Sequence, residues 1–295
     1  MSEFAGLANY AQGFPTNITF SEGIGFLVRD DPKTNLAMMV TAHETAHQWW
    51  GNLLTPGDGP GGNILSEGMA HFATAMLIEE LRGEHRRQEF AKRTESRYGD
   101  RRRKDAERPL VKIDSTQPGD RTVTYDKSSF VVWMLMREIG REPMLAGLRE
   151  FIERYKDGPD YPLLEEMIET LRPHAPDPER FDRFVDQWFF DIVVPEFRLH
   201  DAVREPNGYA WAATARLENF GTGAVEVEVA AVAGKRWDEE GEEDAGYRES
   251  RVTVSLGAGE SRDVRIEAPF EPERIVVDPD VQILQLRRNA AVAEL

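Results

Sequence analysis

The chain has 295 residues, of which 40% are hydrophobic, so it is long enough to form two domains around buried cores. Its net charge is −17, from 53 acidic and 36 basic residues, and the lack of a basic excess argues against nucleic-acid binding. The absence of cysteine excludes a thiolate nucleophile and a cysteine-ligated zinc finger.

Residues 10–30 are predicted to be extended, because hydrophobic and polar residues alternate in NITF (17–20) and GFLV (25–28). The first fifteen residues lack the basic start and the apolar core of a secretory signal. No run of about eighteen apolar residues occurs, so we expect no segment of this chain to span a bilayer.

An apolar-rich helix is predicted over residues 36–50, LAMMVTAHETAHQWW. His43 and His47 are four residues apart and share one helix face, so both imidazoles can point at one metal ion. Glu44 lies beside them, as in metallopeptidases with the His-Glu-x-x-His motif. A histidine pair at this spacing is often only structural, so the motif needs a third ligand to define a site.

A second helix is predicted over residues 65–80, LSEGMAHFATAMLIEE. Glu67 is the expected third zinc ligand, because Ser66 is too weak a ligand and Asp58 lies in a glycine-rich loop. His71 follows Glu67 by one helical turn and could hydrogen-bond to it or compete as a ligand. We favour a simpler interpretation for this histidine, a partly buried polar residue.

The chemistry explains the residue types. Zn²⁺ held by two imidazoles and one carboxylate would keep a position for water, lower the pKa of that water to about 7 and polarise a carbonyl. Glu44 would take the proton of the water as it attacks a peptide carbonyl and pass it to the leaving amine. The pattern therefore predicts a zinc peptidase.

Further helices are predicted where apolar residues recur at helical spacing between clusters of proline and glycine. These stretches are 130–140, 144–156, 163–172 and 181–192. The basic run at 101–104 is surrounded by acidic residues, and we predict a helix end or a solvated loop there.

From Glu196 onward the pattern changes to short alternating runs separated by turns, which predicts an antiparallel β-sandwich. The expected strands are 197–203, 209–219, 224–232, 251–257, 262–268 and 274–279. The charged stretch 238–246 is predicted to be a long exposed hairpin loop. Asp278 and Asp280 could suggest calcium, but a turn capped by an aspartate is the preferred interpretation.

Three segments, in this order, resemble motifs of the gluzincin aminopeptidases of the aminopeptidase N family: HETAHQWWGNLLTP (43–56), SEGMAHF (66–72) and VTYDKSSFVVWML (123–135). The likeness covers roughly residues 10–195. We therefore predict an α+β chain. A thermolysin-like, mainly helical zinc peptidase domain with a short sheet remnant would span residues 1–195, and an all-β immunoglobulin-like sandwich would span residues 196–295.

The resemblance implies a role for each candidate site residue. The ligands of one Zn²⁺ per chain would be His43, His47 and Glu67. Glu44 would be the general base, and the Tyr125 hydroxyl would stabilise the oxyanion on the attacked carbonyl. Glu22, in FSEGIGFL, would bind the free amino terminus of the substrate.

The chain departs from the family pattern at three places. The spacer between His47 and Glu67 is one residue longer than usual, which its glycine-rich loop can absorb. The Gly-x-Met-Glu-Asn signature is absent, and residues 18–30 stand in its place. Ser128 occupies a position where the family normally has glycine.

The predicted function is zinc-dependent hydrolysis of peptides with a free amino terminus, that is, an aminopeptidase. One alternative is an endopeptidase or another hydrolase on the same zinc site, and another is a non-catalytic peptide-binding module. The family's upstream β domain is missing here, so we expect a fragment of a longer chain. The SEGIGF stretch also resembles bacterial peptidase domains attached to polytopic membrane proteins, which suggests a membrane-anchored parent protein.

Overall fold

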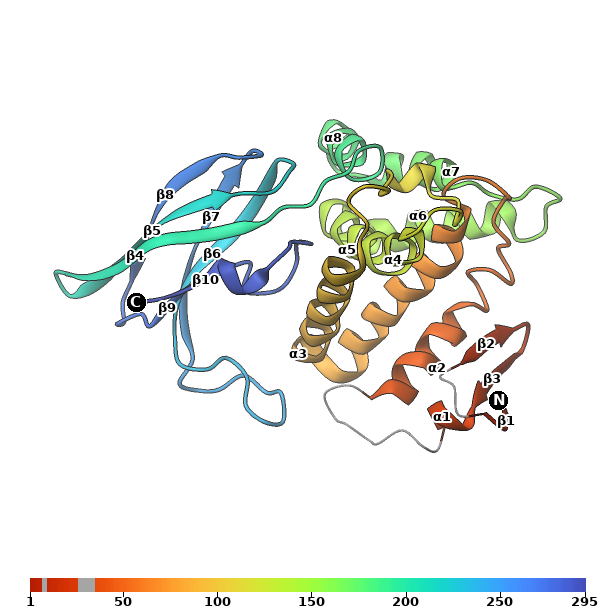
Figure 1. The fold of residues 1–295 in the computed structure, drawn as a ribbon, viewed down its shortest axis with the longest axis horizontal. Helices are drawn as coiled ribbons and strands as arrows, with labels where there is room; N and C mark the ends of the chain where they lie inside the picture. Colours follow the sequence, from red (N-terminus) through yellow and green to blue (C-terminus); the bar gives the residue numbers. More distant parts are fainter. Residues whose placement is uncertain (7–9, 26–34) are drawn as a thin grey trace. The chain divides into compact units, whose positions relative to one another are not determined.

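The computed structural model describes residues 1–6, 10–25 and 35–295. The chain divides into two compact units, Met1–Ile192 and Val193–Leu295. The first unit contains a small sheet and all the α-helices of the described residues, and the second unit is built from β-strands and one short 3₁₀ turn (Figure 1). The predicted α+β class is confirmed.

The small sheet of the first unit has the strand order β1-β3-β2. Its strands are β1 (Ser2–Phe4), β2 (Ala11–Phe14) and β3 (Asn17–Ser21). The chain then forms α1 (Glu22–Gly25), so the prediction of an extended segment is wrong for these residues. Gly23 and Gly25 are poor strand residues, which explains why β3 stops at Ser21. The predicted alternation at 26–28 lies outside the described residues.

Helix α2 (Leu36–Ala46) begins at Asn35, whose side chain accepts a hydrogen bond from the Met38 amide at 2.8 Å. It ends four residues before the predicted limit. The amides of Gln48 and Trp49 donate to carbonyls three residues back, which tightens the last turn. His47 keeps right-handed helical backbone angles at the helix end and therefore stays on the same face as the preceding turn.

The next helical stretch begins with a π-helical turn, η1 (Ile64–Gly68), and continues as α3 (Met69–Arg101). It extends well beyond the predicted limit at residue 80. The backbone of Gly83 is not helical, with φ 78° and ψ 173°, so α3 bends there. The basic run starts at the last residue of α3, as predicted for a helix end.

The remaining helices form the body of the first unit. After a 3₁₀ turn, η2 (Leu110–Lys112), come α4 (Asp120–Thr122), the π-helical η3 (Val123–Lys127), α5 (Ser128–Ile139), α6 (Arg141–Tyr155), α7 (Leu164–Leu171), the 3₁₀ turn η4 (Arg172–His174) and α8 (Pro178–Trp188). The four helices predicted after residue 125 are confirmed. Their fully buried apolar side chains include Val131, Leu135, Phe151, Leu164, Met167 and Leu171. No helix of the described residues is long and apolar enough to cross a membrane.

The second unit contains two antiparallel sheets, with strand orders β4-β5-β8 and β10-β9-β6-β7 (Figure 1). The strands are β4 (Phe197–Asn207), β5 (Ala210–Asn219), β6 (Val225–Ala233), β7 (Arg248–Leu256), β8 (Ser261–Ala268), β9 (Arg274–Val277) and β10 (Val292–Glu294). The six predicted strands are confirmed. Strand β10 has only three residues, too few for alternation to be visible, and follows the short 3₁₀ turn η5 (Arg288–Ala291).

The turns of the second unit follow the predicted chemistry. Residues 238–246 lie in the β6–β7 connection and are mostly exposed. The Asp278 carboxylate accepts hydrogen bonds from the Gln282 amide at 2.8 and 3.0 Å, which is the predicted capped turn. Asp280 forms ion pairs with Arg236 and Arg251, so both aspartates serve structure.

Candidate metal centre

Three potential ligand atoms converge in the first unit. The Nε2 atoms of His43 and His47 are 3.2 Å apart, because the two residues lie four apart on one face of α2. The Oε2 atom of Glu67, from η1, lies 3.0 Å from the first Nε2 and 3.3 Å from the second. Among the described residues, these three side chains form a group that could hold a metal ion.

The geometry of this group fits zinc. In a tetrahedral site with bonds of about 2.0–2.1 Å, neighbouring ligand atoms are about 3.3 Å apart. The three observed separations are 3.0, 3.2 and 3.3 Å. Two imidazoles and one carboxylate are also the ligand set of catalytic zinc sites that keep a fourth position open.

The hydrogen bonds of the two histidines define which nitrogen can bind a metal. His47 Nδ1 lies 2.8 Å from the Trp50 carbonyl oxygen, and because a carbonyl only accepts, Nδ1 carries the proton. The Nε2 lone pair of a neutral His47 therefore faces the cluster. His43 Nδ1 is buried without a hydrogen-bond partner among the described residues, so the structure shows such an anchor only for His47.

The electrostatics of the cluster are those of a carboxylate between two imidazoles. Burial opposes ionisation of Glu67, but its contacts with the two imidazoles hold its pKa far below the usual range. Burial likewise opposes charge on His47, yet the Glu67 carboxylate raises the pKa of that imidazole. The site therefore keeps the Glu67 carboxylate ionised, which is the form that a bound cation requires.

The π-helical turn that carries Glu67 packs closely against the start of α5. A β-carbon on Gly68 would overlap the Ser128 hydroxyl and would lie 3.1 Å from the Thr124 carbonyl oxygen. The fully buried Ser128 hydroxyl donates a hydrogen bond to that carbonyl. Ser128, which replaces the glycine of the family pattern, is thus accommodated because the opposing residue lacks a side chain.

Glu44 lies next to the cluster without belonging to it. Its side chain is buried, and strand β2 passes it closely at Gly13. A β-carbon on Gly13 would lie 2.6 Å from the Glu44 carbonyl oxygen and 3.3 Å from its carboxylate. The strand can approach the general-base candidate only because residue 13 is glycine.

Tyr125 lies on η3 and packs directly on His43, one of the predicted metal ligands. Its ring stacks on the His43 ring with centroids 5.9 Å apart and an angle of 23° between the planes. Burial and the nearby Glu67 carboxylate raise the pKa of the Tyr125 hydroxyl above its usual value. The hydroxyl is therefore protonated at neutral pH and able to donate a hydrogen bond.

Glu22 is the first residue of α1 and is half-buried. It lies outside the three-residue cluster, although α1 packs against α2. The structure thus brings together three predicted ligands, with Glu44 adjacent in sequence and Tyr125 in ring contact, but it does not place the Glu22 carboxylate in that group.

His71 makes contacts that its sequence position did not indicate. Its Nε2 lies 3.0 Å from a guanidinium nitrogen of Arg97, which also donates to Asp126. Burial, reinforced by His43 and Arg97, holds the pKa of His71 well below its usual value. The favoured interpretation as a buried polar residue agrees with this placement. The sequence did not identify Arg97 as part of this region, because nothing in the sequence of a charged helix indicates which arginine has a buried partner.

A buried ion pair joins the end of η3 to the loop after α3. Lys127 donates to Glu107 at 2.8 Å, and both side chains are 1% exposed. The Tyr98 hydroxyl donates to the same carboxylate at 2.6 Å. Burial lowers the pKa of Lys127, while Lys127 lowers that of Glu107 despite burial. These contacts fix the end of η3 to the loop after α3.

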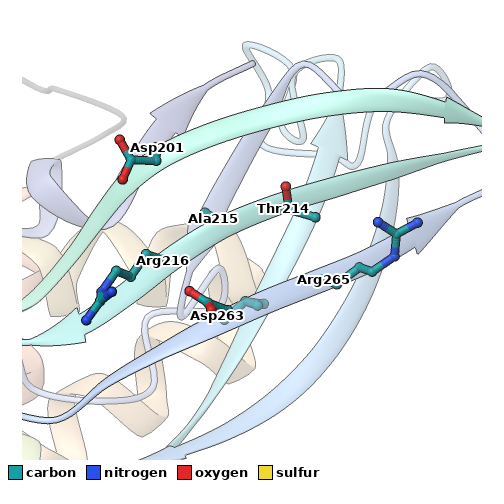
Figure 2. Close-up of a pocket in the computed structure, with 7 residues that line it drawn as sticks. Asp201, Thr214, Ala215, Arg216, Asp263 and Arg265 are labelled. Carbon is teal, nitrogen blue, oxygen red and sulfur yellow. The ribbon is translucent and has the colours of Figure 1, made fainter.

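An open hollow of about 450 Å³ lies on the β4-β5-β8 sheet of the second unit (Figure 2). Its lining consists of Asp201, Thr214, Ala215, Arg216, Asp263, Val264 and Arg265. The charged side chains at its rim are exposed, and it contains none of the predicted site residues. We assign it no catalytic role.

The family model of the peptidase family M1 domain matches residues 26–188, more than half of the chain. The chain therefore belongs to peptidase family M1, and the predicted resemblance to the aminopeptidase N family is confirmed. Membership agrees with zinc as the cofactor. No curated protein matches the chain.

Solved structures of M1 zinc metallopeptidases are similar to the chain. One from Deinococcus radiodurans shares 17% identity over 62% of this chain and 37% of its own, with a TM-score of 0.47. A mutant from the same organism bound to a Tyr-Ser-Ala substrate shares 19% identity over 52% and 32%, with a TM-score of 0.42. A two-domain M1 mutant bound to L-arginine shares 15% over 64% and 39%, with a TM-score of 0.49. The chain spans 32–39% of the length of these structures.

Proposed function

We propose that this chain is the catalytic part of a zinc aminopeptidase. The single observation that carries the proposal is the convergence of His43 Nε2, His47 Nε2 and Glu67 Oε2 at separations of 3.0–3.3 Å. Membership of peptidase family M1 makes peptide hydrolysis the reaction that best fits this cluster.

The mechanism follows from the residues around the cluster. His43, His47 and Glu67 would hold Zn²⁺, which would supply Lewis-acid polarisation of a carbonyl and would make the attacking water more acidic. Glu44, one residue after the first ligand, accepts the proton of the attacking water and returns it to the leaving amine. Its burial keeps the carboxylate away from bulk solvent, so the proton stays near the reacting groups.

Tyr125 and Glu22 complete the proposed machinery. The protonated Tyr125 hydroxyl donates a hydrogen bond to the carbonyl oxygen as negative charge develops on it. Glu22 pairs with the ammonium group of the substrate, which selects peptides with a free amino terminus. The position of Glu22 on α1, next to α2, is compatible with this role.

We also propose a fold for each of the two domains. Residues 1–195 form a thermolysin-like catalytic domain, and residues 196–295 form an immunoglobulin-like sandwich. The buried inward-facing positions of β5, β6 and β8, such as Leu217, Val229 and Ile266, support a two-sheet core. Membrane anchoring of a bacterial parent protein stays a prediction from the resemblance of the SEGIGF stretch.

Metal analysis and a substrate panel test the proposal. The purified chain is expected to bind one zinc and to hydrolyse amino-acid anilides with a free amine, but not their amino-blocked counterparts. Cleavage of both sets would instead indicate an endopeptidase or another hydrolase on the same site. Zinc binding without any cleavage, also in the longest natural form of the chain, would indicate a peptide-binding module.

The Glu22→Ala variant tests whether Glu22 binds the amino terminus of the substrate, independently of the rest of the site. The Michaelis constant for free-amine substrates should rise at least about tenfold, the usual effect of losing a charge-assisted contact, with zinc content unchanged. Any residual cleavage of blocked substrates should be unaffected. Equal effects on both substrate sets would refute the anchor role.

A further inference from the structure

One arginine side chain links two elements of the proposed active site. Arg97 lies on α3 beyond the bend at Gly83. Its Nε donates to Asp126 Oδ1 at 2.7 Å, and one terminal nitrogen donates to the same oxygen and lies 3.0 Å from His71 Nε2. The guanidinium thus contacts the segment that follows Glu67 and the segment that carries Tyr125.

Both partners of this arginine are buried. Asp126 is 2% exposed and His71 is 9% exposed. A guanidinium only donates hydrogen bonds, so His71 Nε2 must accept, and this contact fixes the orientation of the imidazole ring. A buried carboxylate without a partner is costly, so Asp126 depends on Arg97 for its position.

The two partners in turn touch the predicted catalytic groups. Asp126 follows Tyr125 directly in η3. The His71 ring packs edge-on against the rings of His43, at 5.5 Å, and Tyr125, at 6.2 Å. Since Tyr125 also stacks on His43, the three rings contact one another. Arg97 contacts the His71 ring directly and binds Asp126, the residue next to Tyr125.

We propose that Arg97 is a positioning residue that holds the Tyr125 hydroxyl in its place beside the proposed metal ligands. The proposal rests on the proposed function. A π-helical turn replaces the usual i→i+4 hydrogen bonds by i→i+5 bonds and is rare, so contacts from outside help to favour this conformation of η3. Arg97 provides such a contact through Asp126, and the Ser129 hydroxyl provides another by donating to the Tyr125 carbonyl at 2.7 Å.

A double-mutant cycle distinguishes positioning from a general structural role. Arg97→Met keeps the aliphatic stem and removes all donors. We expect kcat for a free-amine anilide to fall about 10- to 100-fold, with KM changed less than about threefold and zinc content unchanged. In the Tyr125→Phe background the same substitution should lower kcat by less than about threefold more, because the hydroxyl that Arg97 positions is already gone. An equal loss in both backgrounds would overturn the proposal.

Two further variants serve as controls. Arg93→Gln removes the same charge from the same helix one turn earlier, at an exposed position whose charge also reaches His71. Its kcat should stay within about twofold of the wild type. Arg97→Lys keeps the charge but not the planar fork, so it should recover part of the activity lost in Arg97→Met. Equal losses in Arg93→Gln and Arg97→Met would contradict positioning through hydrogen bonds.

A spectroscopic measurement decides the proposal without turnover. With 3-fluorotyrosine at position 125, the ¹⁹F resonance of the zinc-loaded chain should shift or broaden in Arg97→Met and remain unchanged in Arg93→Gln. An unchanged resonance in Arg97→Met would overturn the proposal. If the wild-type chain hydrolyses no anilide, the proposed function fails, and the ¹⁹F comparison alone then tests whether Arg97 positions Tyr125.

Discussion

At the scale of single residues, the proposed site separates metal binding from proton transfer. His43 and Glu44 are neighbours on α2, yet only the histidine belongs to the group of converging ligand atoms. Because consecutive residues on a helix point about 100° apart, the carboxylate lies beside the ligands and not among them. Glu44 is therefore free to act as a base.

Glu44→Gln tests this separation. The amide keeps the size of the carboxylate but cannot accept the proton of water, so kcat should fall by about 10³-fold, within the usual range for a general base. Zinc content should stay at one per chain. Glu80→Gln, the same change at an exposed position on α3, is the matched control and should leave kcat unchanged. Normal turnover in Glu44→Gln would exclude this residue as the base.

The convergence of the three ligand candidates could be predicted from sequence because their chemistry is local. His43 and His47 share a face by helical spacing alone, and Glu67 was the remaining acidic candidate at the start of the next helix. Arg97 could not be predicted in this way, because it meets Asp126 across 29 residues of sequence. Which of several arginines in a charged helix turns inward depends on tertiary packing, which the local sequence does not show.

At the scale of elements, both π-helical turns carry proposed functional residues, Glu67 in η1 and Tyr125 in η3. Such turns occur often at functional sites. A π-helical turn holds one residue more than an α-helical turn, so η1 and the glycine-rich loop before it together offer room for the extra residue of the spacer. Periodicity in the sequence predicted the helix here but could not reveal the wider turn.

Gly68→Ala tests the close packing of η1 against α5. Alanine favours helix over glycine by about 1 kcal/mol, but its β-carbon would overlap the Ser128 hydroxyl. Overpacking typically costs about 1–3 kcal/mol, so we expect a net loss of unfolding free energy in urea and a lower kcat. Adding Ser128→Gly, which restores the family residue, should recover part of both. No recovery would show that Ser128 is not the limiting contact, and Ser128→Gly alone is the control.

At the scale of the whole molecule, the change from helical to alternating periodicity near Pro195 predicted the six strands β4–β9. The strands were visible because each buries alternate residues, as in β8, where Val264, Ile266 and Ala268 are buried and their neighbours exposed. The sheet orders were not predictable, because pairing such as β6 with β9 joins strands far apart in sequence. The same reason explains why the sequence did not predict the π turns or the bend in α3. Each of these features depends on packing between distant residues and not on the local sequence pattern.

All three proposed zinc ligands belong to the first unit, Met1–Ile192, so metal removal should act on that unit selectively. A metal bound only to the folded state at 1,000 times its Kd stabilises by about 4 kcal/mol, and for a unit of this size each 1 kcal/mol shifts Tm by about 2–4 °C. Chelation should therefore lower the Tm of the first unit by about 8–16 °C. Hydrogen exchange measured by mass spectrometry should show lost protection in α2, η1 and α3, with β4–β9 unchanged. The His47→Ala variant, which lacks one ligand, should respond little to chelator. Equal loss of protection in both units would mean that the metal stabilises the chain as one cooperative body.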